Sequence, residues 1–175
     1  MSKNKRPPRS VPERDDYYMG LAFWIMAKSK DPDTQIGSVI INSSNRPLGW
    51  GYNGPPRLLP DEEVDWSRPE KYDFIKHAEA NAIDHSNCDD LHDATLYVTA
   101  KPCKKCMLDI ISHEIPRVIY YPLKGGAGSS LGDNTLHDRT DELAQDARIQ
   151  LVQFQGNLNW MRDHIRKLEA MGIFD

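Results

Sequence analysis

The fold is decided by two short segments, 76-KHAEANAIDH-85 and 101-KPCKKCMLDI-110. The first places His77 at the start of an Ala-rich helical pattern, and the second places Cys103 and Cys106 at CxxC spacing near the start of another. Residues three apart lie on one face of a helix, so the two thiols can reach one ion. Imidazole and thiolate ligands favour Zn²⁺ over Mg²⁺ or Ca²⁺, which prefer oxygen. The two segments therefore predict a zinc site formed where two helices begin.

Glu79 lies two residues after His77 and distinguishes a catalytic zinc site from an architectural one. A structural site would be closed by a fourth Cys or His, but His85 lies about two helical turns beyond His77 and Cys88 lies further still. Three protein ligands leave one tetrahedral position for water, and a nearby carboxylate can carry protons to a leaving group. H-x-E followed by P-C-x-x-C is the signature of zinc-dependent nucleobase deaminases. The alternative is an architectural zinc site, in which Glu79 would have no role.

Predicted helices and strands alternate along the chain after an initial hairpin. The helices are expected at about 14–29, 77–86, 102–113, 138–147 and 157–171, and the strands at 36–42, 45–53, 94–100, 117–121 and 149–154. Pro102 is expected at the first position of its helix, where a missing N–H costs nothing. Residues 54–76 form a long Pro-rich loop, and loops of that length are usually functional or disordered. The order of elements predicts an α/β fold, a three-layer αβα sandwich with a central mixed sheet of about five strands flanked by helices.

The 175 residues amount to about one domain. Residues 1–13 are basic and Pro-rich and are expected to form a flexible N-terminal arm, which leaves 14–175 as a single domain. The formal net charge of -4 argues against a nucleic-acid partner, because proteins that bind polynucleotides normally carry a basic excess. No apolar run approaches the roughly 18 residues of a membrane span. The three cysteines, an odd and sparse number, indicate a reducing compartment and predict a cytoplasmic protein.

Further segments resemble the deoxycytidylate (dCMP) deaminase family. They are 29-SKDPDTQIGSVIIN-42 and 49-GWGYNGPPR-57, and together with the zinc motifs they extend the match over about residues 17–121. The SKDPxTQxG and GYNG patterns are more restrictive than the zinc motifs, which related deaminases share. The resemblance implies a cytidine deaminase-like fold and the hydrolytic deamination of dCMP to dUMP and ammonia, a reaction that supplies dUMP for thymidylate synthesis.

The resemblance also implies the roles of the metal-site residues. His77, Cys103 and Cys106 would hold one Zn²⁺ per chain, and Glu79 would act as the proton shuttle. Activated water would attack C4 of the cytosine while Glu79 protonates N3 and then passes a second proton to the departing ammonia. Some relatives carry a second, structural zinc, but only Cys88 remains here after the CxxC pair.

Substrate contacts follow from the same resemblance. Asn53 matches the Asn that bonds the sugar hydroxyl in related deaminases, and the backbone at Ala78 is expected to read the pyrimidine edge. The monophosphate needs a cation, and the candidates are Lys30 and Arg57, each of which could equally be plain surface charge. Tyr120 could stack on the base, with a core aromatic as the alternative. Two hydroxyl groups could assist in binding, those of Ser29 and Thr34.

Regulation is a further property of the family. dCTP with Mg²⁺ activates and dTTP inhibits, at a site near the GYNG turn and the subunit contacts. Its counterpart here would be formed by the four turn residues Gly51, Tyr52, Asn53 and Gly54, whose glycines would let the backbone approach a triphosphate closely. The helix after HAEANAI reads DHSNC, where regulated members are expected to carry an aromatic residue and an Arg. Members commonly assemble as hexamers, so a homo-oligomer is expected, with no membrane or nucleic-acid partner.

Three rival interpretations remain open. A tRNA adenosine deaminase has nearly the same zinc motifs, although the acidic balance and the GYNG context favour a free nucleotide. A dCTP deaminase on this scaffold would differ in the phosphate count of its substrate. A non-catalytic zinc module could bind nucleotide as a sensor. Its phosphate cradle could be the Gly-rich segment 122-PLKGGAGSS-130, although that segment lacks the GxxxxGK[ST] spacing.

Overall fold

The structure is a computed structural model that describes residues 8–86, 90–123 and 139–174. Cys88, residues 1–7 of the predicted arm and most of the Gly-rich segment 122–130 lie outside the described residues. Among the described helices, none is both long and apolar enough to cross a membrane.

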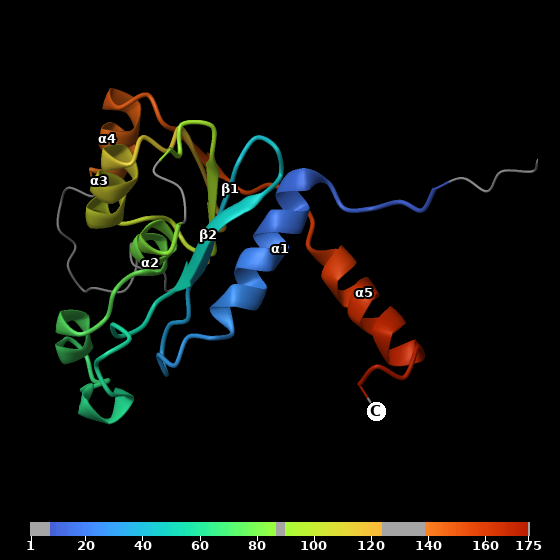
Figure 1. Ribbon diagram of the computed structural model, residues 1–175, viewed down its shortest axis with the longest axis horizontal. Coiled ribbons are helices and arrows are strands. Elements are labelled where there is room, and N and C mark those ends of the chain that lie inside the picture. The colour runs from blue at the N-terminus through green and yellow to red at the C-terminus, as the bar shows by residue number, and fades with distance from the viewer. Residues whose placement is uncertain (1–7, 87–89, 124–138, 175) are drawn as a thin grey trace, which may run out of the picture.

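A five-stranded sheet forms the centre of the fold, with the strand order β2-β1-β3-β4-β5 (Figure 1). Its strands are β1 Gly37–Ile41, β2 Pro47–Tyr52, β3 Thr95–Val98, β4 Arg117–Tyr120 and β5 Gln150–Gln153. β1 is antiparallel to both β2 and β3, whereas β4 runs parallel to both β3 and β5. The prediction of a mixed sheet of about five strands is therefore confirmed.

Helices cover both faces of this sheet (Figure 1). They are α1 Arg14–Met26, α2 Ala78–Asp84, α3 Lys104–Ser112, α4 Thr140–Asp146 and α5 Asn159–Ala170. α2, α3 and α4 pack on one face, and α1 packs on the other, with α5 beyond α1. This arrangement confirms the predicted αβα sandwich.

The core is divided into two layers because successive residues of a strand point to opposite faces of the sheet. Ile40, Leu96 and Val118 belong to the layer beneath α2 and α3. Val39 and Ile119 belong to the layer beneath α1. Each of these five side chains is 1% exposed or less. The first layer therefore holds in place the two helix starts that carry the metal-ligand residue types.

Two helix boundaries differ from the sequence prediction. α1 ends at Met26 rather than near residue 29, because the N–H groups that follow bond three residues back and tighten the chain into a turn. α3 begins at Lys104, and Cys103 adopts an extended conformation at the N-cap, with φ -80° and ψ 169°. The expectation that Pro102 is the first helical residue is therefore wrong, since Pro102 precedes the cap.

Segment 54–76 is a packed loop with two short 3₁₀ helices, η1 Asp61–Glu63 and η2 Glu70–Asp73. Its ends are joined by a β-bridge in which Gly54 and Lys76 exchange backbone hydrogen bonds of 3.1 and 2.9 Å. These contacts tie the loop to the domain immediately before α2 begins.

The glycines of β2 allow α2 to lie directly on the sheet. A Cβ atom at Gly51 would lie 2.5 Å from the carbonyl oxygen of Ala78 and 2.5 Å from the amide nitrogen of Ala82. Gly51→Ala is therefore expected to lower the free energy of unfolding by about 1–3 kcal/mol, measured by denaturant titration. Gly54→Ala is the matched control, because a Cβ atom there would meet only the Tyr52 ring, at 3.7 Å. Equal stability of the two variants would contradict this account of the packing.

Candidate metal centre

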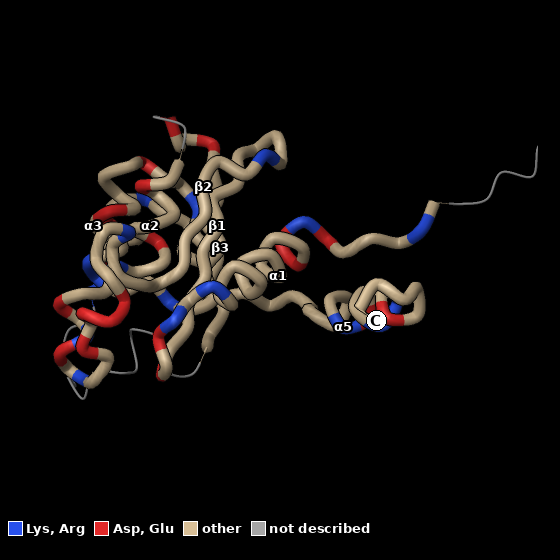
Figure 2. Tube along the Cα trace, turned by 60° about the horizontal axis from the view of Figure 1, so that its bottom comes forward, with Lys and Arg blue, Asp and Glu red and all other residues tan. Residues whose placement is uncertain are grey.

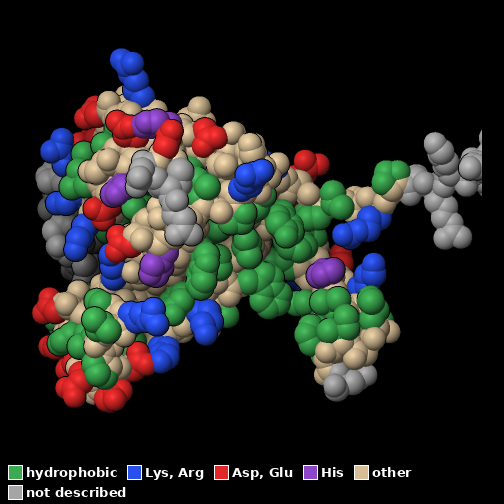
Figure 3. Space-filling model, in the orientation of Figure 1, with side chains coloured by type: hydrophobic (Ala, Val, Ile, Leu, Met, Phe, Trp, Pro, Cys, Tyr) green, Lys and Arg blue, Asp and Glu red, His purple; other side chains and the backbone are tan. Residues whose placement is uncertain are grey.

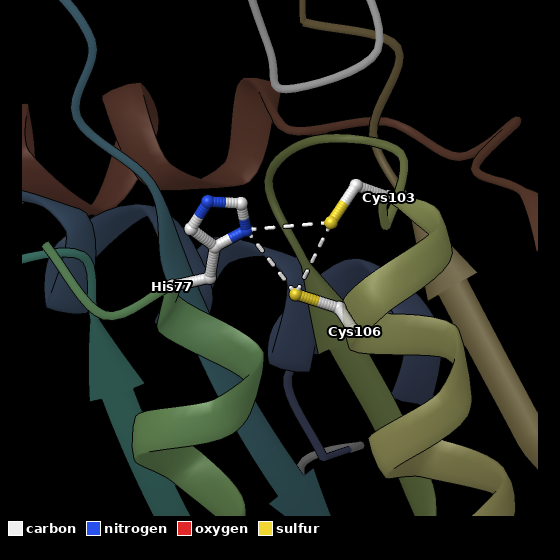
Figure 4. Close-up of side chains that lie close together, drawn as sticks. All are labelled: His77, Cys103 and Cys106. Atoms are coloured by element: carbon white, nitrogen blue, oxygen red, sulfur yellow. Dashed lines mark hydrogen bonds between the residues drawn. The ribbon is translucent and has the colours of Figure 1, made fainter. Parts of the chain in front are cut away.

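Three side chains, those of His77, Cys103 and Cys106, meet between the starts of α2 and α3 (Figure 4). Nδ1 of His77 lies 3.2 Å from Sγ of Cys106 and 3.6 Å from Sγ of Cys103, and the two sulfurs are 3.7 Å apart. In a tetrahedral zinc site, bond lengths of about 2.1 Å to nitrogen and about 2.3 Å to sulfur separate N from S by roughly 3.6 Å and S from S by roughly 3.8 Å. The three residues predicted to share an ion therefore lie together, at distances that fit one zinc ion.

Two of these residues occupy helix N-cap positions. His77 caps α2 and Cys103 caps α3, and neither side chain makes a capping hydrogen bond. N-caps usually carry Ser, Thr, Asp or Asn, whose oxygen accepts a bond from the first turn. Here both side chains instead point toward Cys106 (Figure 4). The free N–H groups at the start of α3 also favour thiolate over thiol at Cys103.

The three side chains of the cluster shift one another's pKa values. The hydrogen bond with Cys106 lowers the pKa of the Cys103 thiol to about 4, and His77 adds to that shift. The hydrogen bond with Cys103 raises the pKa of His77 to about 8, against the effect of burial. The hydrogen bond with Cys103 and burial raise the pKa of the Cys106 thiol. Zinc binding would release the protons carried by the thiol and imidazole groups, because zinc binds thiolate and neutral imidazole.

Glu79 lies in the first turn of α2 and is 4% exposed. Burial raises the pKa of its carboxyl group, and the nearby His77 acts in the opposite direction. A carboxyl group with a raised pKa holds a proton more readily than an exposed one, which suits a group that carries protons between reacting atoms. His77 and Glu79 line the same cavity, although two residues span about 200° of an ideal helix. They can do so because His77 is extended and lies outside the helix proper.

A small cavity of about 50 Å³ adjoins His77 and Glu79. Three of the predicted substrate contacts, Asn53, Ala78 and Thr34, are among its lining residues. The candidate metal ligand His77, the buried carboxyl group of Glu79 and the polar residue Asn53 therefore line one cavity.

The two cations predicted to bind the substrate phosphate lie elsewhere. Lys30 and Arg57 line a second hollow of about 350 Å³, together with Tyr52 and Gly54 of the GYNG turn. Lys30 also forms an ion pair with Asp61 on the same hollow. The hollow with the GYNG turn thus contains both cations, and neither belongs to the lining of the first cavity.

Asn53 is 6% exposed, and the protein itself engages its carboxamide. Its Oδ1 accepts hydrogen bonds from the Ile36 amide at 2.7 Å and the Ser29 hydroxyl at 2.8 Å. Its Nδ2 donates to the Thr34 carbonyl at 2.8 Å and more weakly to Oδ2 of Asp31 at 3.4 Å. A sugar hydroxyl would therefore bind Asn53 by replacing the 3.4 Å contact or by sharing Oδ1. Ser29 contacts Asn53 and is not among the cavity-lining residues.

Four polar residues that line the cavity were not predicted from the sequence: Asp31, Lys71, Tyr72 and Lys101. The Tyr72 hydroxyl is buried and has no hydrogen-bond partner within the described part of the chain. The SKDP pattern drew attention to the loop that contains Asp31, but no spacing signal identified Lys71, whose partner Asp31 lies 40 residues away. Tyr120 is half-buried and packs against the hydrophobic core, which fits the alternative of a core aromatic.

Metal-ligand side chains beside a buried carboxyl group at a cavity are typical of enzymes that activate water. In zinc-dependent nucleobase deaminases, the ligands and the proton-carrying Glu come from H-x-E and P-C-x-x-C. Both patterns occur here at the starts of the two helices that meet in Figure 4. The fold and the site thus define the class of zinc-binding nucleobase deaminases.

Sequence comparison places the chain within that class. The model of the cytidine and deoxycytidylate deaminase zinc-binding region matches residues 12–122. The chain therefore belongs to the cytidine and deoxycytidylate deaminase family. It is 38% identical over 123 residues to the deoxycytidylate deaminase of Homo sapiens, a match covering 63% of this chain and 69% of that relative. It is 40% identical over 117 residues to a probable deoxycytidylate deaminase of Drosophila melanogaster, covering 61% of this chain and 58% of the relative.

Solved structures share the fold. The dCMP deaminase from the cyanophage S-TIM5, crystallised in complex with dCMP and dUMP, aligns with a TM-score of 0.62 at 19% identity. The alignment covers 83% of this chain and 100% of that one. RibD from Acinetobacter baumannii aligns with a TM-score of 0.55, also at 19% identity, over 79% of this chain and 34% of that one. Because differently named proteins share the fold, the fold alone does not select the substrate.

Proposed function

We propose that this protein catalyses the hydrolytic deamination of dCMP to dUMP and ammonia, and so supplies dUMP for thymidylate synthesis. The observation that carries the proposal is the buried Glu79 on a cavity shared with His77, beside the CxxC pair. The relatives named deoxycytidylate deaminase support dCMP as the substrate.

In the proposed reaction, His77, Cys103 and Cys106 hold one zinc ion per chain. Zinc in this position supplies the Lewis acidity that makes water a nucleophile near neutral pH. Glu79 takes a proton from the attacking water and delivers it to N3 of the cytosine. It then transfers the second proton of the water to the amino group, which leaves C4 as ammonia. The oxygen of the water becomes the new carbonyl oxygen of uracil, so all atoms are accounted for.

Two groups of the cavity wall are proposed to orient the nucleotide. The backbone N–H of Ala78, the first residue of α2, has no acceptor within its own helix and would donate to the pyrimidine edge. Asn53 would bind the sugar hydroxyl in exchange for its long contact with Asp31. Both residues line the cavity that reaches Glu79.

Ammonia release tests the proposal, with dCMP, dCTP and cytidine as alternative substrates and a tRNA anticodon stem-loop assayed for inosine. We expect dCMP to give the highest kcat/KM and the stem-loop to give no inosine. Faster turnover of dCTP would identify a dCTP deaminase on this scaffold, and inosine formation would identify a tRNA deaminase. Binding of dCMP with no product from any substrate would favour the non-catalytic nucleotide-binding module.

The distribution of charge supports a free nucleotide as the substrate. Acidic and basic residues are interspersed along the chain in Figure 2 rather than separated into one basic face. A protein that binds nucleic acid normally clusters Lys and Arg on one surface. This pattern and the net charge of -4 support the proposal that nucleic acid is not a partner.

A regulatory nucleotide site is proposed at the second hollow, which contains part of the GYNG turn. Tyr52 and Gly54 line it, together with the cations Lys30 and Arg57. Two cations suit a triphosphate, because charged hydrogen bonds to phosphate are the strong ones. Gly51 would contribute through packing, since the space beside it is filled by α2. In this proposal dCTP with Mg²⁺ activates and dTTP inhibits, and rates of dCMP turnover with each effector test it.

Assembly into a homo-oligomer, a hexamer by analogy with the family, is also proposed. Hydrophobic side chains gather over α1 and α5 on the face seen in Figure 3. Large exposed hydrophobic residues of α1 and of the segment after α5 include Tyr17, Trp24, Met171 and Phe174. Exposed apolar patches commonly mark protein interfaces. The mass of the protein in solution, measured by light scattering, tests the proposal.

A further inference from the structure

A cluster of ion pairs with a buried centre, the pair of Lys71 and Asp31, joins two segments that line the cavity. The ammonium group of Lys71 lies 2.8 Å from Oδ1 of Asp31 and 2.8 Å from Oδ2 of Asp33. The Lys71 side chain is 1% exposed and that of Asp31 is 3% exposed. Nε of Arg68 adds an ion pair of 3.1 Å to Asp33. Two acidic and two basic groups thus tie the SKDPDTQ loop to η2 and the residues just before it.

Stability alone is a poor explanation for such a cluster. Taking charged groups out of water is costly, and a well-packed apolar pair of similar volume is often as stable or more stable. Burial by itself would lower the pKa of Lys71, but the hydrogen bonds with Asp31 and Asp33 outweigh it and raise the pKa above its ordinary value. Lys71 is therefore a fixed positive charge, and the geometry that it enforces is the feature to explain.

Asp31 transmits this geometry to Asn53. Oδ1 of Asp31 accepts the backbone N–H groups of Asp33 and Thr34 at 2.9 and 3.0 Å. Oδ2 of Asp31 accepts the 3.4 Å contact from Nδ2 of Asn53. The Thr34 carbonyl, held in the same turn, accepts the other Nδ2 hydrogen at 2.8 Å. Asp31 thus supplies one acceptor of the Asn53 Nδ2 group and holds the turn that supplies the other, and Lys71 in turn holds Asp31. Oδ1 of Asn53 is held separately, by Ile36 and Ser29.

We propose that Lys71 is a positioning residue for nucleotide binding, which holds Asp31, and through it Asn53, in the arrangement that receives the sugar. The inference rests on the proposed function, in which Asn53 contacts the substrate. Carboxylates take two of the three ammonium hydrogens of Lys71, and the proposed role is exerted through these partners rather than on the reacting atoms. Substitution of Lys71 is therefore expected to raise KM and to leave kcat nearly unchanged.

Lys71→Met removes the charge with little change in side-chain length and leaves Asp31 without its buried cation. We expect KM for dCMP to rise about tenfold, while kcat stays within about threefold of the parent and zinc content is unchanged. Steady-state ammonia release and elemental analysis of the zinc-loaded enzyme measure these quantities. Arg139→Met removes an exposed ion pair with Glu142 and serves as the control, with parental values expected.

A double-mutant cycle with Asp31→Asn tests the route through Asp31. Asn at this position keeps an oxygen for the backbone N–H of Thr34 but carries no charge. We expect either single change to raise KM, and the double variant to return KM to within about threefold of the parent. If Lys71→Met does not fold, Asp31→Asn supplies the single-variant test, because it separates Lys71 from its buried partner.

The outcomes distinguish this inference from the proposed function. A parent enzyme that deaminates no cytosine nucleotide would contradict both the proposed function and the positioning role of Lys71. An active parent whose KM changes by less than about twofold in the single variants would overturn only the positioning role. A double variant whose KM is as high as that of the single variants would also overturn the positioning role. A fall in kcat at unchanged KM would do the same, because it would place the effect of Lys71 in the chemical step.

Discussion

Substituting Gln for Glu79 is expected to lower kcat for dCMP by about 10²–10⁴-fold, while zinc content stays at the parental level. Gln has nearly the same size and shape, so it fits a position that is 4% exposed. Its amide cannot take a proton from water or deliver one to N3, so both proton transfers lose their carrier. Ammonia release gives the rate, and elemental analysis gives the zinc content.

Glu142→Gln is the matched control, because the same change falls on an exposed carboxylate of α4 that pairs with Arg139. A parental kcat is expected there. Loss of zinc from Glu79→Gln would show that Glu79 is a metal ligand rather than a proton carrier. A kcat that stays within about tenfold of the parent would mean that another group moves the protons.

Much of the architecture could be predicted because the sheet and its helices carry strong local patterns. β1, with the sequence GSVII, is buried along its whole length because it lies between β2 and β3 and is covered on both faces. Such a continuous apolar run is visible in sequence. The ends of helices were harder to place. Cys103 must leave the helix to reach the cluster, and no propensity for helix predicts that requirement.

The metal cluster could be predicted because all three of its residues lie within two short sequence motifs. His77 comes from one motif, and Cys103 and Cys106 come from the other, only three residues apart. Each motif starts a helix, so the side chains of a motif have a nearly fixed relation to one another before tertiary structure is considered. Contact between the starts of α2 and α3 is the one tertiary feature that the cluster requires.

The cavity wall could not be predicted in this way, because its contacts join residues that are distant in sequence. Lys71 and Asp31 have side chains that are usually exposed, and only the folded chain reveals that both are buried together. For the same reason, the sequence could not show that Lys30 and Arg57, its candidates for the substrate phosphate, both line the second hollow. Their role at the phosphate stays a prediction. Asn53 was recognised by its motif, but the four hydrogen bonds of its carboxamide depend on tertiary contacts.

Replacing Cys106 with Ser is expected to strip the protein of zinc and to lower kcat/KM for dCMP by at least about 10³-fold, since the activated water depends on the metal. Cys106 is 2% exposed and faces both other ligand residues, His77 and Cys103. A hydroxyl group at this position does not ionise near neutral pH, and zinc in such sites prefers thiolate sulfur. Zinc per chain and the rate of ammonia release are the two measurements.

Cys88→Ser makes the same chemical change at the third cysteine of the chain and is expected to retain one zinc ion and parental activity. Parent enzyme stripped by a chelator should regain activity with Zn²⁺ and not with Mg²⁺, because two thiolates and an imidazole suit a borderline-soft ion and not one that requires oxygen ligands. If Cys106→Ser kept both its zinc and its turnover, the ion would have to be held by other side chains. Recovery with Mg²⁺ would likewise contradict a site built on sulfur.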